Sequence, residues 1–285
     1  MARAVAARPE AEIHGDPQAK RPQKFARLRG ARRVWAIGAI HGEAQRLIAL
    51  HDQLLPRLRR GDRVVYLGNY LGHGDAVGET VDELLDFRRR ALARAGTFAC
   101  DIVFLRGAQE EMWHKLLQLQ FAADPRAVLN WMVEEGIEPT LRAYGGELQQ
   151  GLAAAREGPM RITRWTSALR NSMNAAPGHT TLFASLRHAA LTDESGVLFV
   201  HAAVNPARSL HAQGDAFWWG RGDILDLSGK FAGFRRVVRG FDRQGRGPVE
   251  TDYAVSLDAG AGRGGALIAG CLEAADGKVI ETLEA

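Results

Sequence analysis

Three short, mostly apolar runs recur in the first part of the chain, and each is followed by a loop containing glycine and then by a helical pattern. The runs span residues 34–37, 63–67 and 102–105. Leucines recur every three to four residues between 43 and 58, which together with residues 77–95 gives the first two predicted helices. Because the runs do not alternate apolar and polar residues, we expect a sheet with covered faces. The repeated strand and helix pattern predicts an α/β fold.

The middle of the chain has helical patterns, whereas the end has patterns typical of strands. Residues from about 121 to 187 show consecutive helical patterns with prolines at 125, 139 and 177, and we interpret this stretch as an inserted helical cap. Short apolar runs then return at 189–191, 197–200, 236–238, 253–257 and 266–272. A last strand is predicted after the turn at Asp276-Gly277.

The start of the chain is set apart by its charge. Residues 1–33 hold nine Arg or Lys and three Asp or Glu, a net charge of +6, whereas the rest holds 28 basic and 30 acidic residues, a net charge of −2. We expect residues 1–32 to form a disordered basic tail and residues 33–285 to form the folded domain. An anionic surface, such as a membrane or a nucleic acid, is one candidate partner for the tail, and a solvated tail without a partner is the alternative.

The sequence shows no pattern typical of a signal peptide or a transmembrane helix. No run of eighteen apolar residues occurs, and the tail has no apolar core typical of a signal peptide. Cys100 and Cys271 have no redox or zinc-motif spacing, and we expect both to be buried thiols. These observations favour a cytoplasmic protein without a transmembrane segment.

The loops after the predicted strands carry the polar residues to examine, because ligands of open α/β sheets bind at the carboxyl ends of strands. These loops read Gly38-Ala39-Ile40-His41-Gly42, Gly68-Asn69-Tyr70-Leu71-Gly72-His73-Gly74, Arg106-Gly107-Ala108-Gln109-Glu110 and His201-Ala202-Ala203. Their order and spacing resemble the calcineurin-like metallophosphoesterase superfamily, and within it the bacterial Ser/Thr phosphoprotein phosphatases. The resemblance runs from about residue 33 onward. It implies a four-layer α/β/β/α sandwich.

The family's chemistry, as the resemblance implies it, uses two divalent cations that share a bridging Asp and a hydroxide, which attacks phosphorus. In this sequence the position of the first Asp ligand holds Ala39, and that of the bridging Asp holds Asn69. Ala108 replaces the family's Asn ligand, and Gly240-Phe241 replaces its late Gly-His. Most of the metal ligands are therefore lost.

Further departures affect proton transfer and phosphate binding. Gln109 stands where the family has the His that protonates the leaving group, and an amide cannot act as a general acid. Gly72-His73 replaces the family's Asp-Arg pair, which removes a guanidinium suited to phosphate. Among the motif residues, His41, Glu110 and His201 keep the family's identity.

Three functional hypotheses follow. The first is a pseudophosphatase with a vestigial site (His41, Asn69, His73, Gln109 and His201), no cofactor, and a role as a scaffold for an unknown protein or phospho-ligand. The second is a divergent phosphoesterase whose site is rebuilt around His41, Asn69, His73 and His201 with a divalent transition metal such as Mn or Fe. The third is a metal-free binder of phosphorylated or other anionic ligands through Arg106, Arg221 and the histidines. The segment Trp218-Trp219-Gly220-Arg221 resembles one that places an arginine near phosphate in bacterial relatives.

Overall fold

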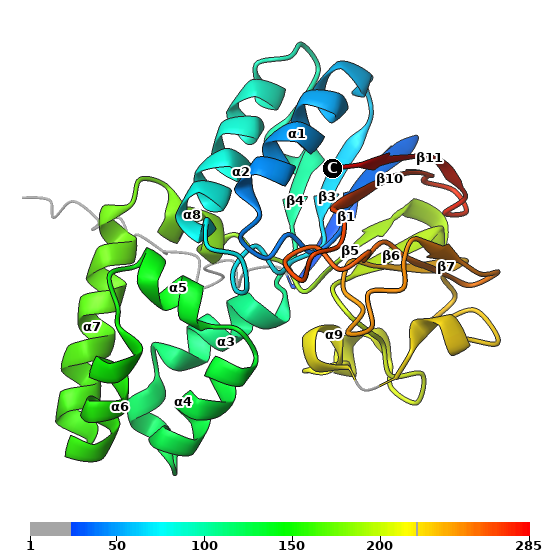
Figure 1. Cartoon of the computed structure of the whole chain (residues 1–285). Coiled ribbons are helices and arrows are strands. Elements are labelled where there is room, and N and C mark those ends of the chain that lie inside the picture. Colours follow the sequence, from blue (N-terminus) through cyan, green and yellow to red (C-terminus); the bar gives the residue numbers. More distant parts are fainter. Residues whose placement is uncertain (1–23, 221) are drawn as a thin grey trace, which may run out of the picture.

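The computed structural model describes residues 24–220 and 222–285. Most of the predicted basic tail lies outside the described residues. The described strands form two sheets, and helices gather on one of them and in a separate lobe (Figure 1). This arrangement confirms the predicted α/β/β/α sandwich with a helical insertion.

The first sheet has the order β11-β10-β2-β3-β4, and the second has the order β1-β5-β6-β7-β9-β8. The strands of the first sheet are β2 (Arg33–Ile37), β3 (Arg63–Tyr66), β4 (Ile102–Phe104), β10 (Ile268–Glu273) and β11 (Val279–Glu284). Those of the second are β1 (Phe25–Leu28), β5 (Ala189–Thr192), β6 (Val197–Val200), β7 (Arg236–Arg239), β8 (Val249–Glu250) and β9 (Ala254–Ser256).

The strands of the first sheet are apolar on both faces because both faces are buried. In β2, Val34 and Ala36 belong to the core between the sheets, whereas Trp35 and Ile37 belong to the core beneath helices α1 (Ala44–Leu54) and α2 (Val77–Leu92). All four residues are fully buried. The continuous apolar run predicted this two-sided burial.

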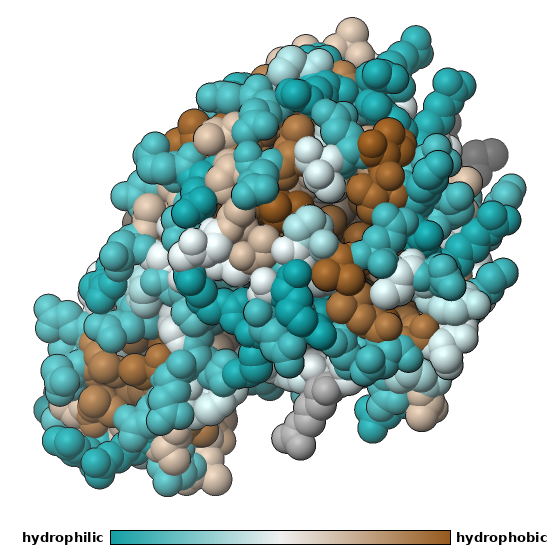
Figure 2. Space-filling view, turned by 45° about the vertical axis from the view of Figure 1, so that its right-hand side comes forward, coloured by the Kyte–Doolittle hydropathy of each residue, from teal (hydrophilic) through white to brown (hydrophobic). Residues whose placement is uncertain are grey.

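The outer layer on the second sheet is thin. The helix α9 (Ala216–Trp219) packs there with irregular segments over residues such as Leu198 and Val237. The cap is formed by α4 (Pro125–Glu134), α5 (Glu138–Ala143), α6 (Leu148–Glu157), α7 (Pro159–Ala175) and α8 (His179–Ala184), reached from α3 (Ala108–Leu116). Helices α4 to α7 extend away from the sheets at the lower left of Figure 1. Hydrophobic colour on the face in Figure 2 falls in separate patches, one of them on this lobe.

Two sequence-based expectations differ from the structure. The strand β1 lies inside the predicted tail 1–32, so the folded domain begins before residue 33. Its four residues pair in parallel with β5, and Leu28 is buried between the sheets. Phe25 and Ala26 are half-buried and Arg27 is exposed, so the strand shows no clear apolar periodicity. Cys100 is exposed rather than buried, because it lies in the turn before β4, while Cys271 on β10 is buried.

The helices of the structure can be compared with the length and hydropathy that a transmembrane helix needs. Within residues 24–220 and 222–285, no helix combines the length and the apolar character needed to cross a bilayer.

Candidate functional site

Loops from both sheets meet in a cleft of about 720 Å³ beside the cap. His41 follows β2, Asn69 and His73 follow β3, and Gln109 lies at the start of α3, and all four line this cleft. His201, which follows β6, is fully buried behind them. The fold therefore brings the five residues of the predicted vestigial site to one place.

The Glu110 carboxylate ties the loops after β3 and β4 together. It is buried and accepts hydrogen bonds from the backbone N–H groups of Asn69, Tyr70, Leu71 and Gly107 at 2.8–3.2 Å. Burial raises the pKa of the Glu110 carboxyl, and the four N–H groups oppose that shift. Glu110 thus organises the backbone of these loops and does not line the cleft.

The Asn69 side chain is fully engaged with its neighbours. Its Oδ1 accepts a hydrogen bond from the backbone N–H of Gln109 at 2.9 Å, so its Nδ2 is the donor that lies 3.3 Å from Nε2 of His41. The backbone of Asn69 has a φ of +56°, a conformation that asparagine tolerates better than most residues. The lone pair of His41 Nε2 is therefore occupied by an amide.

Phe241 fills the space between the two retained histidines. Its ring stacks on that of His201 with centroids 5.3 Å apart and 6° between the planes, and it meets the ring of His41 edge-on at 5.7 Å. The Arg263 guanidinium lies 5.5 Å from the centroid of the same ring. An apolar ring with a cation over its face thus lies between His41 and His201.

His201 is a neutral imidazole at neutral pH. Its Nδ1 donates to the carbonyl of Leu67 at 2.7 Å, and burial lowers its pKa to about 4. Its Nε2 is buried and has no hydrogen-bond partner among the described residues. Burial, followed by the charge of the neighbouring His73, lowers the pKa of His41 well below its ordinary value.

The cap loop between α4 and α5 forms hydrogen bonds with two residues of the predicted site. Gln109 Nε2 donates to the carbonyl of Glu135 at 2.6 Å, and the backbone N–H of His73 donates to the carbonyl of Gly136 at 3.0 Å. A Cβ at Gly136 would lie 2.5 Å from the His73 ring, and one at Gly72 would lie 2.4 Å from the Gln109 side chain. Both side chains are held by packing that only glycine permits.

Two arginines and two aspartates form a closed ring of ion pairs on one wall of the cleft. Arg239 contacts Asp223 at 3.0 Å and Asp242 at 2.9 Å, and Arg246 contacts the same two carboxylates. Arg239 is buried and also donates to the Ser256 hydroxyl at 2.9 Å. Burial lowers the pKa of Arg239, whereas hydrogen bonds to Asp242 and Asp223 raise that of Arg246. The four charges compensate one another.

Sequence reasoning did not find this ring. Asp223 and Asp242 lie in loops, and nothing in their spacing along the sequence links them to Arg239 or Arg246. The one available signal is Arg239 itself, a charged residue directly after the apolar pair Val237-Val238. An aromatic wall of the cleft is formed by Trp131 and Trp219, whose ring centroids lie 5.5 Å apart.

The two arginines proposed to bind anions have different places. Arg106 does not line the cleft, and its guanidinium pairs with Glu111 at 2.9 Å. Arg221 lies outside the described residues. In the part of the chain that the structure describes, no three His, Cys, Asp or Glu side chains are grouped so that they could hold a metal ion.

Comparisons with known proteins bear on the fold. No protein-family model matches the chain, and no curated protein matches its sequence. Among solved structures, one described as a "putative diadenosine tetraphosphatase" is 17% identical, with a TM-score of 0.56 over 92% of this chain and 97% of the other. A cold-active protein-tyrosine phosphatase from a psychrophilic Shewanella species is 13% identical, with a TM-score of 0.50 over 91% of this chain and 82% of the other. On this similarity, the chain has the calcineurin-like metallophosphoesterase fold.

Proposed function

We propose that this protein is a catalytically silent member of the phosphatase-like fold, a pseudophosphatase whose cleft serves as a binding or regulatory surface. The observation that carries the proposal is the filled site. The Phe241 ring stacks on His201, and the Asn69 amide occupies His41. Where the family has ligands, Ala39 and Ala108 offer no donor atom.

Electrostatics supports this proposal. Two divalent cations about 3.5 Å apart repel each other by on the order of 20 kcal/mol at an effective dielectric of 20, so carboxylates must lie among them. The residues at this place are two neutral imidazoles and a neutral amide. These residues do not fit a two-metal centre.

The residue at the position of the family's general acid offers no proton for a leaving group. The Gln109 amide is not acidic, and its Nε2 already donates to the carbonyl of Glu135. We therefore propose that the cleft binds a phospho-ligand or a partner protein without turning it over. The aromatic wall at Trp131 and Trp219 would supply contact area. We further propose that the protein acts in the cytoplasm of a bacterium.

One observation favours the alternative of a divergent phosphoesterase with a rebuilt site. His201 Nε2 is buried without a partner among the described residues, which a metal such as Mn or Fe would satisfy. The His73 ring lies 4.7 Å from that of His41 and would supply a further ligand. Against this alternative, the described residues place no three such side chains around one point.

A turnover assay separates the two proposals. The wild-type chain is incubated with p-nitrophenyl phosphate and with a phosphopeptide in the presence of Mn²⁺ or Fe²⁺, beside the double variant Asn69→Ala, His201→Ala. We expect equal rates for the two proteins, because neither has the ligands or the acid. Circular dichroism shows whether the variant is folded. Turnover in the wild type that the variant lacks would favour the rebuilt site.

A further inference from the structure

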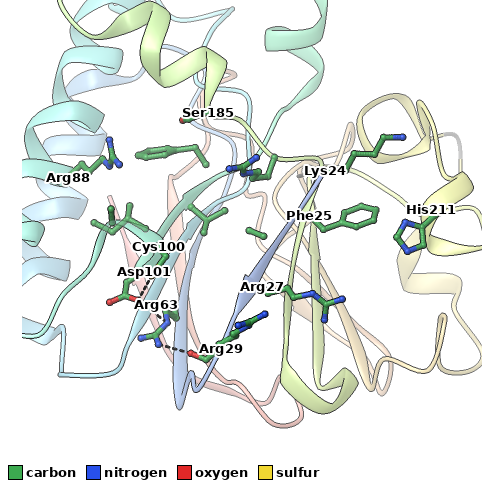
Figure 3. Close-up of a pocket in the computed structure, with 16 residues that line it drawn as sticks. Lys24, Phe25, Arg27, Arg29, Arg63, Arg88, Cys100, Asp101, Ser185 and His211 are labelled. Atoms are coloured by element: carbon green, nitrogen blue, oxygen red, sulfur yellow. Dashed lines mark hydrogen bonds and ion pairs between the residues drawn. The ribbon is translucent and has the colours of Figure 1, made fainter. Parts of the chain in front are cut away.

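A second depression of about 790 Å³ lies between the edge strands of the two sheets and shares no lining residue with the cleft. On one side are β4, the turn before it and Arg88 of α2, and on the other is β1 with His211 beyond it (Figure 3). We call this depression the edge groove. Its floor includes Ile102, Val103 and Phe104.

The edge groove is strongly cationic. The positively charged residues on its lining are Lys24, Arg27, Arg29, Arg63, Arg88 and Arg187, and Asp101 is the acidic one among the described residues there. Asp101 is already paired, because it contacts Arg63 at 3.2 Å and accepts the backbone N–H of Phe98 at 2.8 Å. Its charge is therefore not available to neutralise the others.

Four of these cations have no carboxylate partner among the described residues. Lys24, Arg27 and Arg29 are exposed and make no ion pair there. Arg88 is half-buried, and its Nε is buried without a hydrogen-bond partner in the described part of the chain. Like charges gathered in one depression repel each other, so an anionic ligand would be stabilised here.

The groove also presents an unpaired strand edge. The strand β1 is the last strand of its sheet and pairs with β5 alone among the described strands. In a parallel pair, alternate residues of a strand direct their backbone groups to the partner, so the other residues of β1 direct theirs to the free edge. Just past the strand, the carbonyl of Arg29 accepts a hydrogen bond from the Arg63 guanidinium at 2.7 Å.

We propose that the edge groove binds an extended acidic segment of a partner protein, which adds to the free edge of β1 as a further strand. Backbone hydrogen bonds to the free edge of β1 would hold the segment, and carboxylates on its alternate residues would pair with Arg27 and Arg88. The free strand edge favours a peptide over a nucleic acid, because only a peptide backbone complements both the N–H and the C=O groups. This inference is independent of whether the cleft is active.

Fluorescence anisotropy tests this proposal with the full chain at low salt. The probe is a labelled nine-residue peptide of alternating Asp and Val, which we expect to bind saturably and more weakly as salt is added. The double variant Arg27→Glu, Arg88→Glu is expected to bind it at least tenfold more weakly. The matched control is Arg32→Glu, Arg89→Glu, which changes two arginines outside the groove lining and is expected to bind within about twofold of the wild type.

A second probe isolates strand addition from charge. The same peptide with N-methylated amides at alternate residues keeps every carboxylate but cannot pair along one edge, and we expect it to bind at least tenfold more weakly. Several results would overturn the proposal. The unmodified peptide could fail to bind saturably, or the N-methylated peptide could bind equally well. The folded double variant could bind the peptide as tightly as the wild type, or a single-stranded oligonucleotide of equal charge could bind more tightly than the peptide.

Discussion

Replacement of Glu110 by alanine is expected to lower the free energy of unfolding by roughly 4 kcal/mol. The reason is that the carboxylate accepts four buried backbone N–H groups, and each unsatisfied donor costs about 1–3 kcal/mol before water or rearrangement compensates. For a chain of this size the melting temperature should fall by about 10 °C. Urea denaturation and thermal melting followed by circular dichroism measure both quantities.

The matched control is Glu134→Ala, an exposed glutamate on α4. We expect it to change stability by no more than about 0.5 kcal/mol. A loss below about 1 kcal/mol in Glu110→Ala would contradict the role of this carboxylate as the tie between the loops after β3 and β4.

The ion-pair ring on the cleft wall allows a comparison of two arginines that share both partners. Arg239→Ala should lower the free energy of unfolding by about 3 kcal/mol, because removal of one member of a buried ion pair leaves a desolvated charge without compensation. The side chains of Arg239 and Asp242 are each 5% exposed, whereas that of Arg246 is 38% exposed. Arg246→Ala should therefore cause a clearly smaller loss, although it touches the same carboxylates.

Denaturant unfolding of the two variants at neutral pH tests this comparison. An equal loss in both variants would show that burial does not decide the contribution of the ring. A larger loss in Arg246→Ala would show that the half-exposed arginine, and not the buried one, holds the wall together.

Most of the sandwich could be predicted from the sequence because burial on two faces leaves a continuous apolar run, as in β2. The strand β1 could not be predicted this way. It has four residues, Arg27 is exposed at its free edge, and its composition matches that of the basic segment before it. Its formation depends on pairing with β5, which lies more than 160 residues away along the chain.

The candidate site was predictable where it depends on residue type and unpredictable where it depends on spatial neighbours. That Ala39 and Asn69 stand where the resembling family has carboxylate ligands follows from their places in the loops. Two contacts depend on how the cap and the second sheet pack against these loops. They are the stacking of Phe241 on His201 and the hydrogen bond from the Gln109 amide to the carbonyl of Glu135. Local spacing carries no information on such contacts.

Metal content tests the central claim most directly, which is that the cleft has lost its two-metal centre. The untagged chain is purified without chelator, incubated with excess Mn²⁺, Fe²⁺ and Zn²⁺, freed of unbound ions, and measured by inductively coupled plasma mass spectrometry. The Asn69→Ala, His201→Ala variant is the control. We predict far less than one ion per chain in both proteins. One or more tightly held ions per chain in the wild type, lost in the variant, would contradict the claim.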